Sequence, residues 1–203
     1  MMSPMKQIVV IHGGDAFPTY QAYISSLKES KIDSVEYFKK RKDWKTTLPE
    51  TLGDEYMALL PQMPNKNNAK YLEWKLWFGK MIPFLKDGMI LIGHSLGAIF
   101  LAKYLSEERF PKKISATFLI AAPYGSDTIH PIVEFTLPDS LALFAEQGGD
   151  IFLYHSKDDP VVPFSELEKY QSALPQARTG VFEDRKHFNQ ENFPEIVTAI
   201  KAA

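Results

Sequence analysis

Residues 89–102 read Met89-Ile90-Leu91-Ile92-Gly93-His94-Ser95-Leu96-Gly97-Ala98-Ile99-Phe100-Leu101-Ala102. The four apolar residues at the start of this stretch are typical of a strand that is buried on both faces. A Gly-x-Ser-x-Gly pentapeptide follows, and the apolar run after it is long enough for a buried helix. The stretch therefore predicts a strand, a sharp turn and a helix in direct succession.

That succession is the context in which Gly-x-Ser-x-Gly forms a nucleophile elbow. The turn holds the backbone of Ser95 in a strained conformation, so that its hydroxyl projects above the sheet. Gly93 and Gly97 flank the serine because a Cβ at either position would collide with the neighbouring strand or helix. The pentapeptide alone also occurs as an ordinary glycine-rich turn, so the interpretation depends on the strand and helix beside it.

Length and composition limit the classes of protein to which the chain can belong. Its 203 residues suit a single domain, 1–203, with a sizeable core. The net charge of −2 argues against nucleic acid or an anionic membrane as a partner. The absence of cysteine excludes disulfides and thiolate metal sites and is compatible with a cytoplasmic location, which we expect. No apolar run approaches the ~20 residues of a membrane span, and residues 1–6 contain no signal core.

Apolar runs typical of strands alternate with amphipathic segments typical of helices along the chain. We expect strands at residues 8–11, 32–38, 89–92, 117–122, 151–154 and 179–182, with the less apolar 32–38 at an edge of the sheet. We expect helices at 18–30, 52–60, 68–85, 96–109, 140–147, 164–172 and 194–203, and a loop-rich region around the prolines of 43–68. This order predicts an α/β fold: a doubly wound, mostly parallel six-stranded sheet with helices on both faces. Ligands bind at the carboxyl ends of the strands in such folds.

A serine nucleophile needs a base, and five histidines are available. His187 follows the last expected strand, which is where the order nucleophile, acid, histidine places the base of this constellation. His12 and His94 lie beside glycines in tight turns, and His155 ends a buried strand, where a packed or hydrogen-bonded role is expected. His130, in the loop after the fourth strand, is a weaker alternative for the base.

The acid that orients the base is expected after the strand 151–154, where two aspartates are adjacent. Pro160 favours an extended backbone at Asp159 and so holds that carboxylate in a fixed position. We therefore assign Asp159 as the acid and expect Asp158 to brace the loop or to face solvent.

The third requirement is a pair of backbone N–H groups for the oxyanion. One is expected from Leu96, directly after the serine, and the other from the glycine-rich loop after the first strand. Gly14 is our choice there, with Asp15 as the alternative.

These segments make the chain resemble the α/β-hydrolases, and more closely the retinoblastoma-binding-protein-9-like family of small serine hydrolases. The segments that carry the resemblance are His12-Gly13-Gly14, Met63-Pro64, Tyr71-Leu72-Glu73-Trp74-Lys75, Gly93–Ala98, Ser156–Pro163 and His187-Phe188. The elbow is common to the superfamily, whereas the Asp-Asp-Pro-Val-Val-Pro and Glu-Trp-Lys segments are more specific to this family.

The resemblance implies a hydrolase without a cap domain, with Ser95, Asp159 and His187 as its triad and carboxylic-ester hydrolysis as its usual activity. One departure is clear. The contact that gives the family its name uses a Leu-x-Cys-x-Glu segment, which a chain without cysteine cannot carry, so no retinoblastoma-type partner is expected.

We therefore expect a serine esterase that acts on small, short-acyl substrates without cofactor or metal. The short insertion between Ala122 and Leu141 leaves no room for a cap domain, and Met63, Trp74 and Trp77 are expected to form a modest pocket wall. An amidase or peptidase with the same triad, and a catalytically idle interaction module on a hydrolase fold, remain the alternatives. The oligomeric state stays open.

Overall fold

The computed structural model describes residues 5–39, 42–125 and 132–203. Within these residues, six strands form one sheet in which every neighbouring pair is parallel, in the order β2-β1-β3-β4-β5-β6. The strands are β1 (Lys6–Ile11), β2 (Tyr56–Leu59), β3 (Met89–His94), β4 (Ile114–Ile120), β5 (Asp150–Ser156) and β6 (Arg178–Phe182). The predicted α/β fold with a parallel six-stranded sheet is confirmed.

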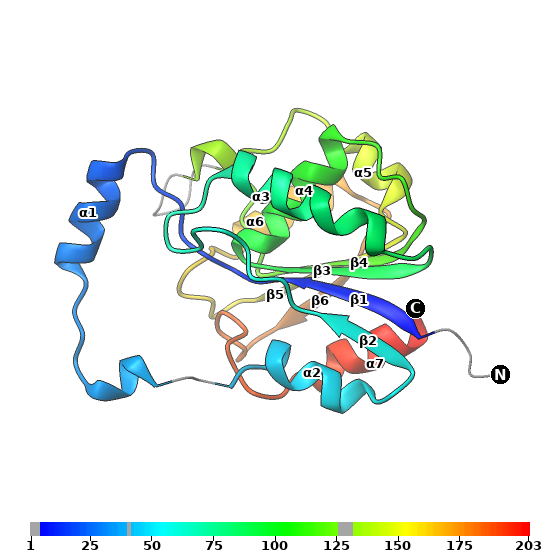
Figure 1. Cartoon of the computed structure of the whole chain (residues 1–203), viewed down its shortest axis with the longest axis horizontal. Helices are drawn as coiled ribbons and strands as arrows, with labels where there is room; N and C mark the ends of the chain where they lie inside the picture. The colour runs from blue at the N-terminus through cyan, green and yellow to red at the C-terminus, as the bar shows by residue number, and fades with distance from the viewer. Residues whose placement is uncertain (1–4, 40–41, 126–131) are drawn as a thin grey trace.

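Helices cover both faces of this sheet (Figure 1). They are α1 (Tyr20–Glu29), α2 (Trp44–Leu52), α3 (Tyr71–Met81), α4 (Leu96–Glu107), α5 (Ala142–Gln147), α6 (Ser165–Ala173) and α7 (Pro194–Ala202), with 3-10 turns at Val35–Phe38, Ile82–Phe84 and Val133–Phe135. Helices α3 to α6 pack on one face, and α2 and α7 pack on the other. Val9 and Ile11 of β1 belong to the first core, and Ile8 and Val10 to the second. Alternate side chains of β1 thus enter opposite cores, which explains its continuous apolar sequence.

Helix α4 is the central element of the first core. Nine of its twelve residues are buried, among them Phe100 and Leu101. Burial of each large apolar side chain stabilises the fold by about 1.5–3 kcal/mol. The turn that begins this helix is therefore fixed to the most stable part of the molecule.

The edge strand lies in a different segment from the one predicted. Residues 32–38 form no strand but end in the 3-10 turn Val35–Phe38, and the side chains of Val35 and Phe38 are each 70% exposed. The edge strand is β2, in a segment expected to be helical, and it pairs in parallel with β1 from Lys6 opposite Tyr56 to Val9 opposite Leu59. Strand preference depends on a partner strand, and the free edge of β1 opposite β3 is taken by β2.

Helix α2 occupies part of the region that was expected to be mainly loop. Asp43 caps it by accepting a hydrogen bond from Thr46 N–H at 3.2 Å, and Trp44, Leu48 and Leu52 are buried beneath the sheet. The apolar contacts of these side chains compensate for Pro49 inside the helix, which removes one backbone donor.

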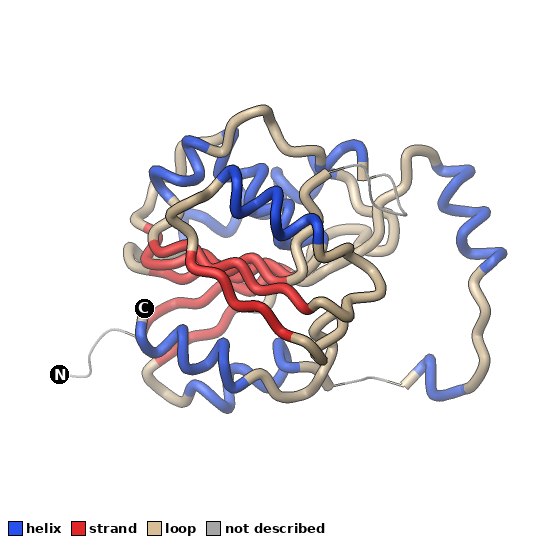
Figure 2. The backbone as a smooth tube through the Cα atoms, turned by 180° about the vertical axis from the view of Figure 1, so that it is seen from behind, coloured by secondary structure: helices blue, strands red, loops and turns tan. Residues whose placement is uncertain are grey.

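Helix α1 lies apart from both faces of the sheet. Thr19 caps its start by accepting from Ala22 N–H at 3.0 Å, but none of its residues is buried. Figures 1 and 2 show it beyond the carboxyl ends of the strands. No helix in the described ranges is long and apolar enough to cross a membrane.

Candidate active site

Ser95 lies in the sharp turn between β3 and α4. Its backbone has φ +55° and ψ −121°, a strained conformation for a residue other than glycine. A Cβ on Gly93 would collide with the backbone of Ala98, and one on Gly97 would collide with the carbonyl of Ile11. Both flanking glycines are therefore required by close approach of the backbone, as predicted.

The carboxylate of Asp159 is held by the turn that follows it. Its Oδ1 accepts hydrogen bonds from the N–H groups of Val161 at 2.8 Å and Val162 at 3.0 Å. The side chain is fully buried, and Oδ2 lies 2.8 Å from Nδ1 of His187. Two amides thus fix Oδ1, which itself lies 3.1 Å from Nδ1, and leave Oδ2 as the nearer partner of the imidazole.

His187 is held by a hydrogen bond at its ring and by hydrogen bonds to the backbone of its loop. With Nδ1–H donating to the carboxylate, the lone pair of Nε2 is free to accept a proton. His94 donates from Nε2 to the His187 carbonyl at 2.8 Å, and Trp44 Nε1 donates to the carbonyl of Phe188 at 2.9 Å. Lys186 and Phe188, on either side, have φ of +48° and +52°. The surrounding contacts keep this strained loop in one conformation.

Asp158 connects the loop that carries the acid to the loop that carries the histidine. Its Oδ1 accepts from Ser156 Oγ at 2.6 Å and from Lys186 N–H at 2.8 Å, and Arg185 N–H donates to Ser156 Oγ at 3.0 Å. The hydrogen bond from Ser156, followed by that from Lys186, lowers the pKa of the Asp158 carboxyl. The structure therefore places Asp158 in a loop-bracing role.

Ser95 lies between two cavities of different character. A polar cavity of about 400 Å³ contains both Ser95 and His187, although no hydrogen bond joins their side chains. Catalytic hydrogen bonds are often long in unliganded enzymes and tighten when substrate binds. The remaining residues of this cavity are His12, Gly13, Gly14, Asp15, Asp43, Lys45, Lys66, His94, Val161 and Asn189. A smaller cavity of about 50 Å³ opens on the other side and is mainly apolar, with Ala16, Leu96, Pro123, Ile132, Val161 and Val162 in its wall.

Two backbone amides at this junction are available to an oxyanion. The N–H groups of Leu96 and Gly14 donate to no group in the described part of the chain. The N–H of Asp15, by contrast, donates to the carbonyl of Lys66 at 2.8 Å. This contact favours Gly14 over Asp15 as the second donor. A Cβ on Gly14 would collide with the same carbonyl of Lys66, so this position requires glycine.

Comparison with known proteins identifies the family. A family model described as serine hydrolase matches residues 38–196. The chain belongs to the serine hydrolase family. Serine hydrolase RBBP9 of Rattus norvegicus is 25% identical over 156 residues, which cover 72% of this chain and 77% of that protein. This agrees with the family resemblance inferred from the sequence.

Solved structures show that the fold is that of the α/β-hydrolases. The ydeN gene product of B. subtilis superposes with a TM-score of 0.77 at 20% identity, over 98% of both chains. The meta-cleavage product hydrolase CumD gives a TM-score of 0.65 at 13% identity, over 98% of this chain and 92% of that one. At these identities the likeness concerns the fold alone.

The expected pocket wall of this serine hydrolase requires correction. Met63 and Trp74 are buried, and Trp74 donates from Nε1 to the carbonyl of Pro64 at 2.8 Å while packing edge-on against His12. Trp77 is 48% exposed. None of the three lines either cavity at Ser95, because Met63 and Trp74 pack into the core and Trp77 lies on the exposed side of α3.

Several residues around Ser95 were not predicted from the sequence. Lys45, Lys66 and Asn189 line the polar cavity, and Ala16 and Ile132 line the apolar one. They come from loops or helix ends without a motif. Asp43 and Thr46 form a capping box at the start of α2. This sequence signal marks the beginning of the helix, and Lys45 lies in its first turn.

Three other histidines of the serine hydrolase are held by hydrogen bonds in and around the site. His12 accepts from Met63 N–H at its Nε2, at 2.9 Å, and His155 contacts the Val162 carbonyl at 3.0 Å. Burial lowers the pKa of His12 and of His155, and it lowers that of the fully buried His94 well below the usual value. His130, the weaker candidate for the base, lies outside the described residues.

The buried histidines predict that stability falls in mild acid. The folded protein keeps these rings neutral, whereas the unfolded chain binds protons below pH ~6.5. The free energy of unfolding should therefore be highest above pH 7 and decrease from pH 6.5 to 5, by up to about 1.4 kcal/mol per pH unit for each histidine. Urea unfolding at pH 7.5, 6 and 5 measures this. His94→Asn should reduce the pH dependence, and a stability that is constant over this range would contradict the argument.

Proposed function

We propose that this serine hydrolase cleaves small carboxylic esters through an acyl-enzyme on Ser95. The observation that carries the proposal is the 2.8 Å contact between Asp159 and His187 in the cavity that also contains the elbow serine. A positioned nucleophile, base and acid are the groups that acyl transfer requires.

Each group has one role in the proposed reaction. His187 Nε2 takes the proton of Ser95 as Oγ forms a bond to the ester carbonyl carbon. The N–H groups of Leu96 and Gly14 stabilise the oxyanion, and loss of one such donor costs about 10²–10³-fold in kcat. His187 then gives its proton to the leaving alkoxide as the C–O bond breaks. Water attacks the acyl-enzyme by the same steps, and Asp159 stabilises the imidazolium in both halves.

A direct test is covalent labelling of Ser95 by a fluorophosphonate probe, together with hydrolysis of p-nitrophenyl butyrate. Labelling that maps to Ser95 and parallels loss of hydrolysis supports the proposal. A wild-type protein that is neither labelled nor active would instead support the idle interaction module.

The apolar cavity supports a preference for short acyl chains. Its volume of about 50 Å³ accommodates only a few carbon atoms, and the buried side chains of Leu96, Ile132 and Val162 line it. An apolar pocket discriminates by about 10–200-fold for each methylene that does not fit. The polar cavity on the other side of the serine then receives the leaving alcohol.

We expect kcat/KM to be at least about tenfold higher for p-nitrophenyl butyrate than for the dodecanoate. Ile132→Ala should enlarge the cavity and reduce this ratio. Steady-state kinetics of the two esters, measured below the micellar concentration of the longer one, provides the comparison. Higher kcat/KM on the dodecanoate in the wild-type protein would refute the assignment of the acyl pocket.

A further inference from the structure

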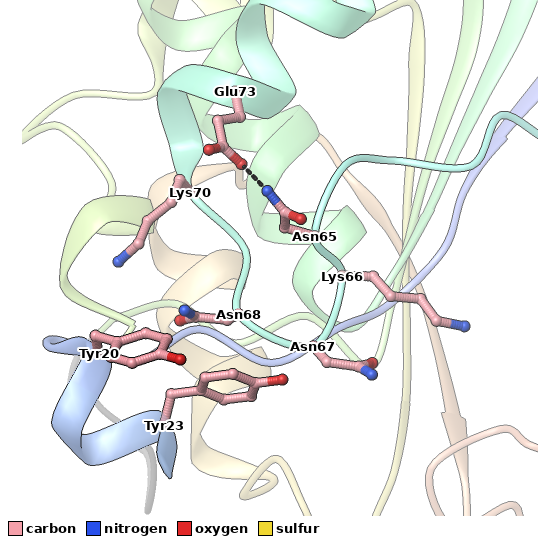
Figure 3. A pocket seen from close by; sticks show the side chains of 8 residues that line it. All are labelled: Tyr20, Tyr23, Asn65, Lys66, Asn67, Asn68, Lys70 and Glu73. Carbon is pink, nitrogen blue, oxygen red and sulfur yellow. Dashed lines mark hydrogen bonds between the residues drawn. The ribbon is translucent and has the colours of Figure 1, made fainter.

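A second cavity lies beside the polar one and shares Lys66 with it. It measures about 450 Å³ and is lined by Tyr20 and Tyr23 of α1, by residues 65–68, and by Lys70 and Glu73 (Figure 3). The side chain of Lys66 points away from the tyrosines. It is also in the lining of the cavity that contains Ser95. The two spaces therefore adjoin at the loop 65–68, and Lys66 faces the leaving-group side of the catalytic serine.

Lys66 differs from the other lysines of the two cavities because they form ion pairs and it forms none with the described residues. Lys45 pairs with Asp43 at 2.6 Å, and Lys70 pairs with Glu134 at 3.0 Å. The ammonium of Lys66 has no ion pair or hydrogen bond to any residue that the structure describes.

The acids of these cavities have other partners. Asp43 is paired with Lys45, and Glu73 accepts from Asn65 Nδ2 at 2.9 Å. Asp15 has an interaction of its own. The charge of Lys66 is therefore left to a ligand of the polar cavity.

The positive charges of Lys66 and Lys45 act on His12, which lines the cavity that contains Ser95. After burial, the charges of Lys66 and Lys45 further lower the pKa of His12, which is next to Gly13. The ring of His12 cannot take up a proton at Nε2 without losing its hydrogen bond from Met63 N–H. The lining of this cavity holds two lysines and two aspartates, and Lys66 is the one of the two lysines without an ion pair among the described residues. Its charge favours a negatively charged group beside it in the cavity.

The loop that carries Lys66 is fixed relative to the serine. The Lys66 carbonyl accepts from Asp15 N–H at 2.8 Å, and Ala69 N–H donates to the carbonyl of Asp15, also at 2.8 Å. Asn68 N–H closes the turn on the carbonyl of Asn65 at 2.7 Å. These bonds tie residues 65–69 to the chain directly after Gly14, so the base of the lysine side chain has a defined position beside the oxyanion donors.

We propose that Lys66 binds a negative charge on the leaving group. The preferred substrates are then short-chain acyl esters of an alcohol that carries a negatively charged group such as a carboxylate. The polar second cavity gives the remainder of such an alcohol room to extend past Lys66. This inference rests on the proposed esterase function and adds the chemical class of its leaving group.

The test compares two acetyl esters that differ in one charge, 4-acetoxybenzoate and its methyl ester. The ratio of their kcat/KM values is measured for the wild type and for Lys66→Met, so that the intrinsic reactivities of the two leaving groups cancel. Lys66→Met should lower the ratio of charged to neutral ester by about tenfold, the effect of one charge-assisted contact. Lys66→Arg should restore most of it.

Two controls complete this experiment. Lys80→Met removes an exposed lysine in the last turn of α3 that lines neither cavity, and it should leave the ratio unchanged. In the wild type the ratio should fall with added salt, since the screening length shrinks from about 10 Å at 0.1 M to about 3 Å at 1 M.

The outcomes separate this inference from the proposed function. Loss of activity on both esters alike in Lys66→Met, with an unchanged ratio, would overturn the inference and assign Lys66 a structural role. Failure of the wild type to hydrolyse even the neutral ester would overturn the esterase proposal itself.

Discussion

Replacement of Ser95 with alanine is expected to lower kcat for p-nitrophenyl butyrate on the order of 10⁶-fold, as removal of the triad serine does in a protease. The methyl group has no oxygen to attack the ester. The fold should be retained, because alanine adopts the φ of +55° at a similar cost and the Ser95 hydroxyl makes no hydrogen bond within the described residues.

The measurement combines steady-state kinetics with circular dichroism and Tm. Ser106→Ala is the matched control, since Ser106 lies in α4, the helix that begins directly after Ser95, and its hydroxyl donates to the Ala102 carbonyl at 2.7 Å. That variant should keep its activity and its fluorophosphonate label. Full activity in Ser95→Ala would disprove the proposed mechanism but leave the fold assignment intact.

The second large effect is expected from Asp159→Asn. The amide oxygen can still accept from Val161 and Val162, but an NH₂ group then faces Nδ1–H of His187. Two donors cannot pair, and Oδ1, at 3.1 Å from Nδ1, already accepts from two amides, so the Nδ1–H tautomer loses its nearer acceptor. The ring then favours the tautomer with its proton on Nε2, which cannot accept a proton from Ser95. The cost should be on the order of 10⁴-fold in kcat, as for the equivalent change in the protease triad.

Asp158→Asn is the adjacent control. Asparagine keeps an oxygen that can accept from Ser156 Oγ and Lys186 N–H, so the brace between the loops persists in weaker form. We expect a loss of about tenfold or less. Both variants are measured at pH 8. If Asp158→Asn is instead the severely impaired variant, our assignment of the acid is wrong by one residue.

The fold was predictable because strands buried on both faces have continuous apolar sequences that are easily recognised. The error at the sheet edge has a physical cause. Residues 32–38 contain β-branched and aromatic side chains, yet no partner strand lies beside them, whereas the Tyr-Met-Ala-Leu segment of β2 has helix-forming residues but pairs with β1. Edge strands are decided by tertiary pairing more than by local preference.

The site was predictable where chemistry demands fixed residue types at fixed positions. Ser95, Asp159 and His187 each follow a strand, and parallel strands bring their carboxyl ends together. The cavity walls follow no such rule. Trp74 was expected in a modest pocket wall, but its large aromatic side chain is fully buried in the core.

Helix α1 forms a wall of the second cavity and can move away from it at a small cost in free energy. It buries none of its own residues, yet it carries Tyr20 and Tyr23. Segments with few buried apolar contacts separate from a protein at a small fraction of its global unfolding free energy. Since neither core contains a residue of α1, a movement of this helix leaves the packing of the sheet in place. A leaving group longer than the resting cavity can displace the tyrosines outward while the geometry around Ser95 stays unchanged.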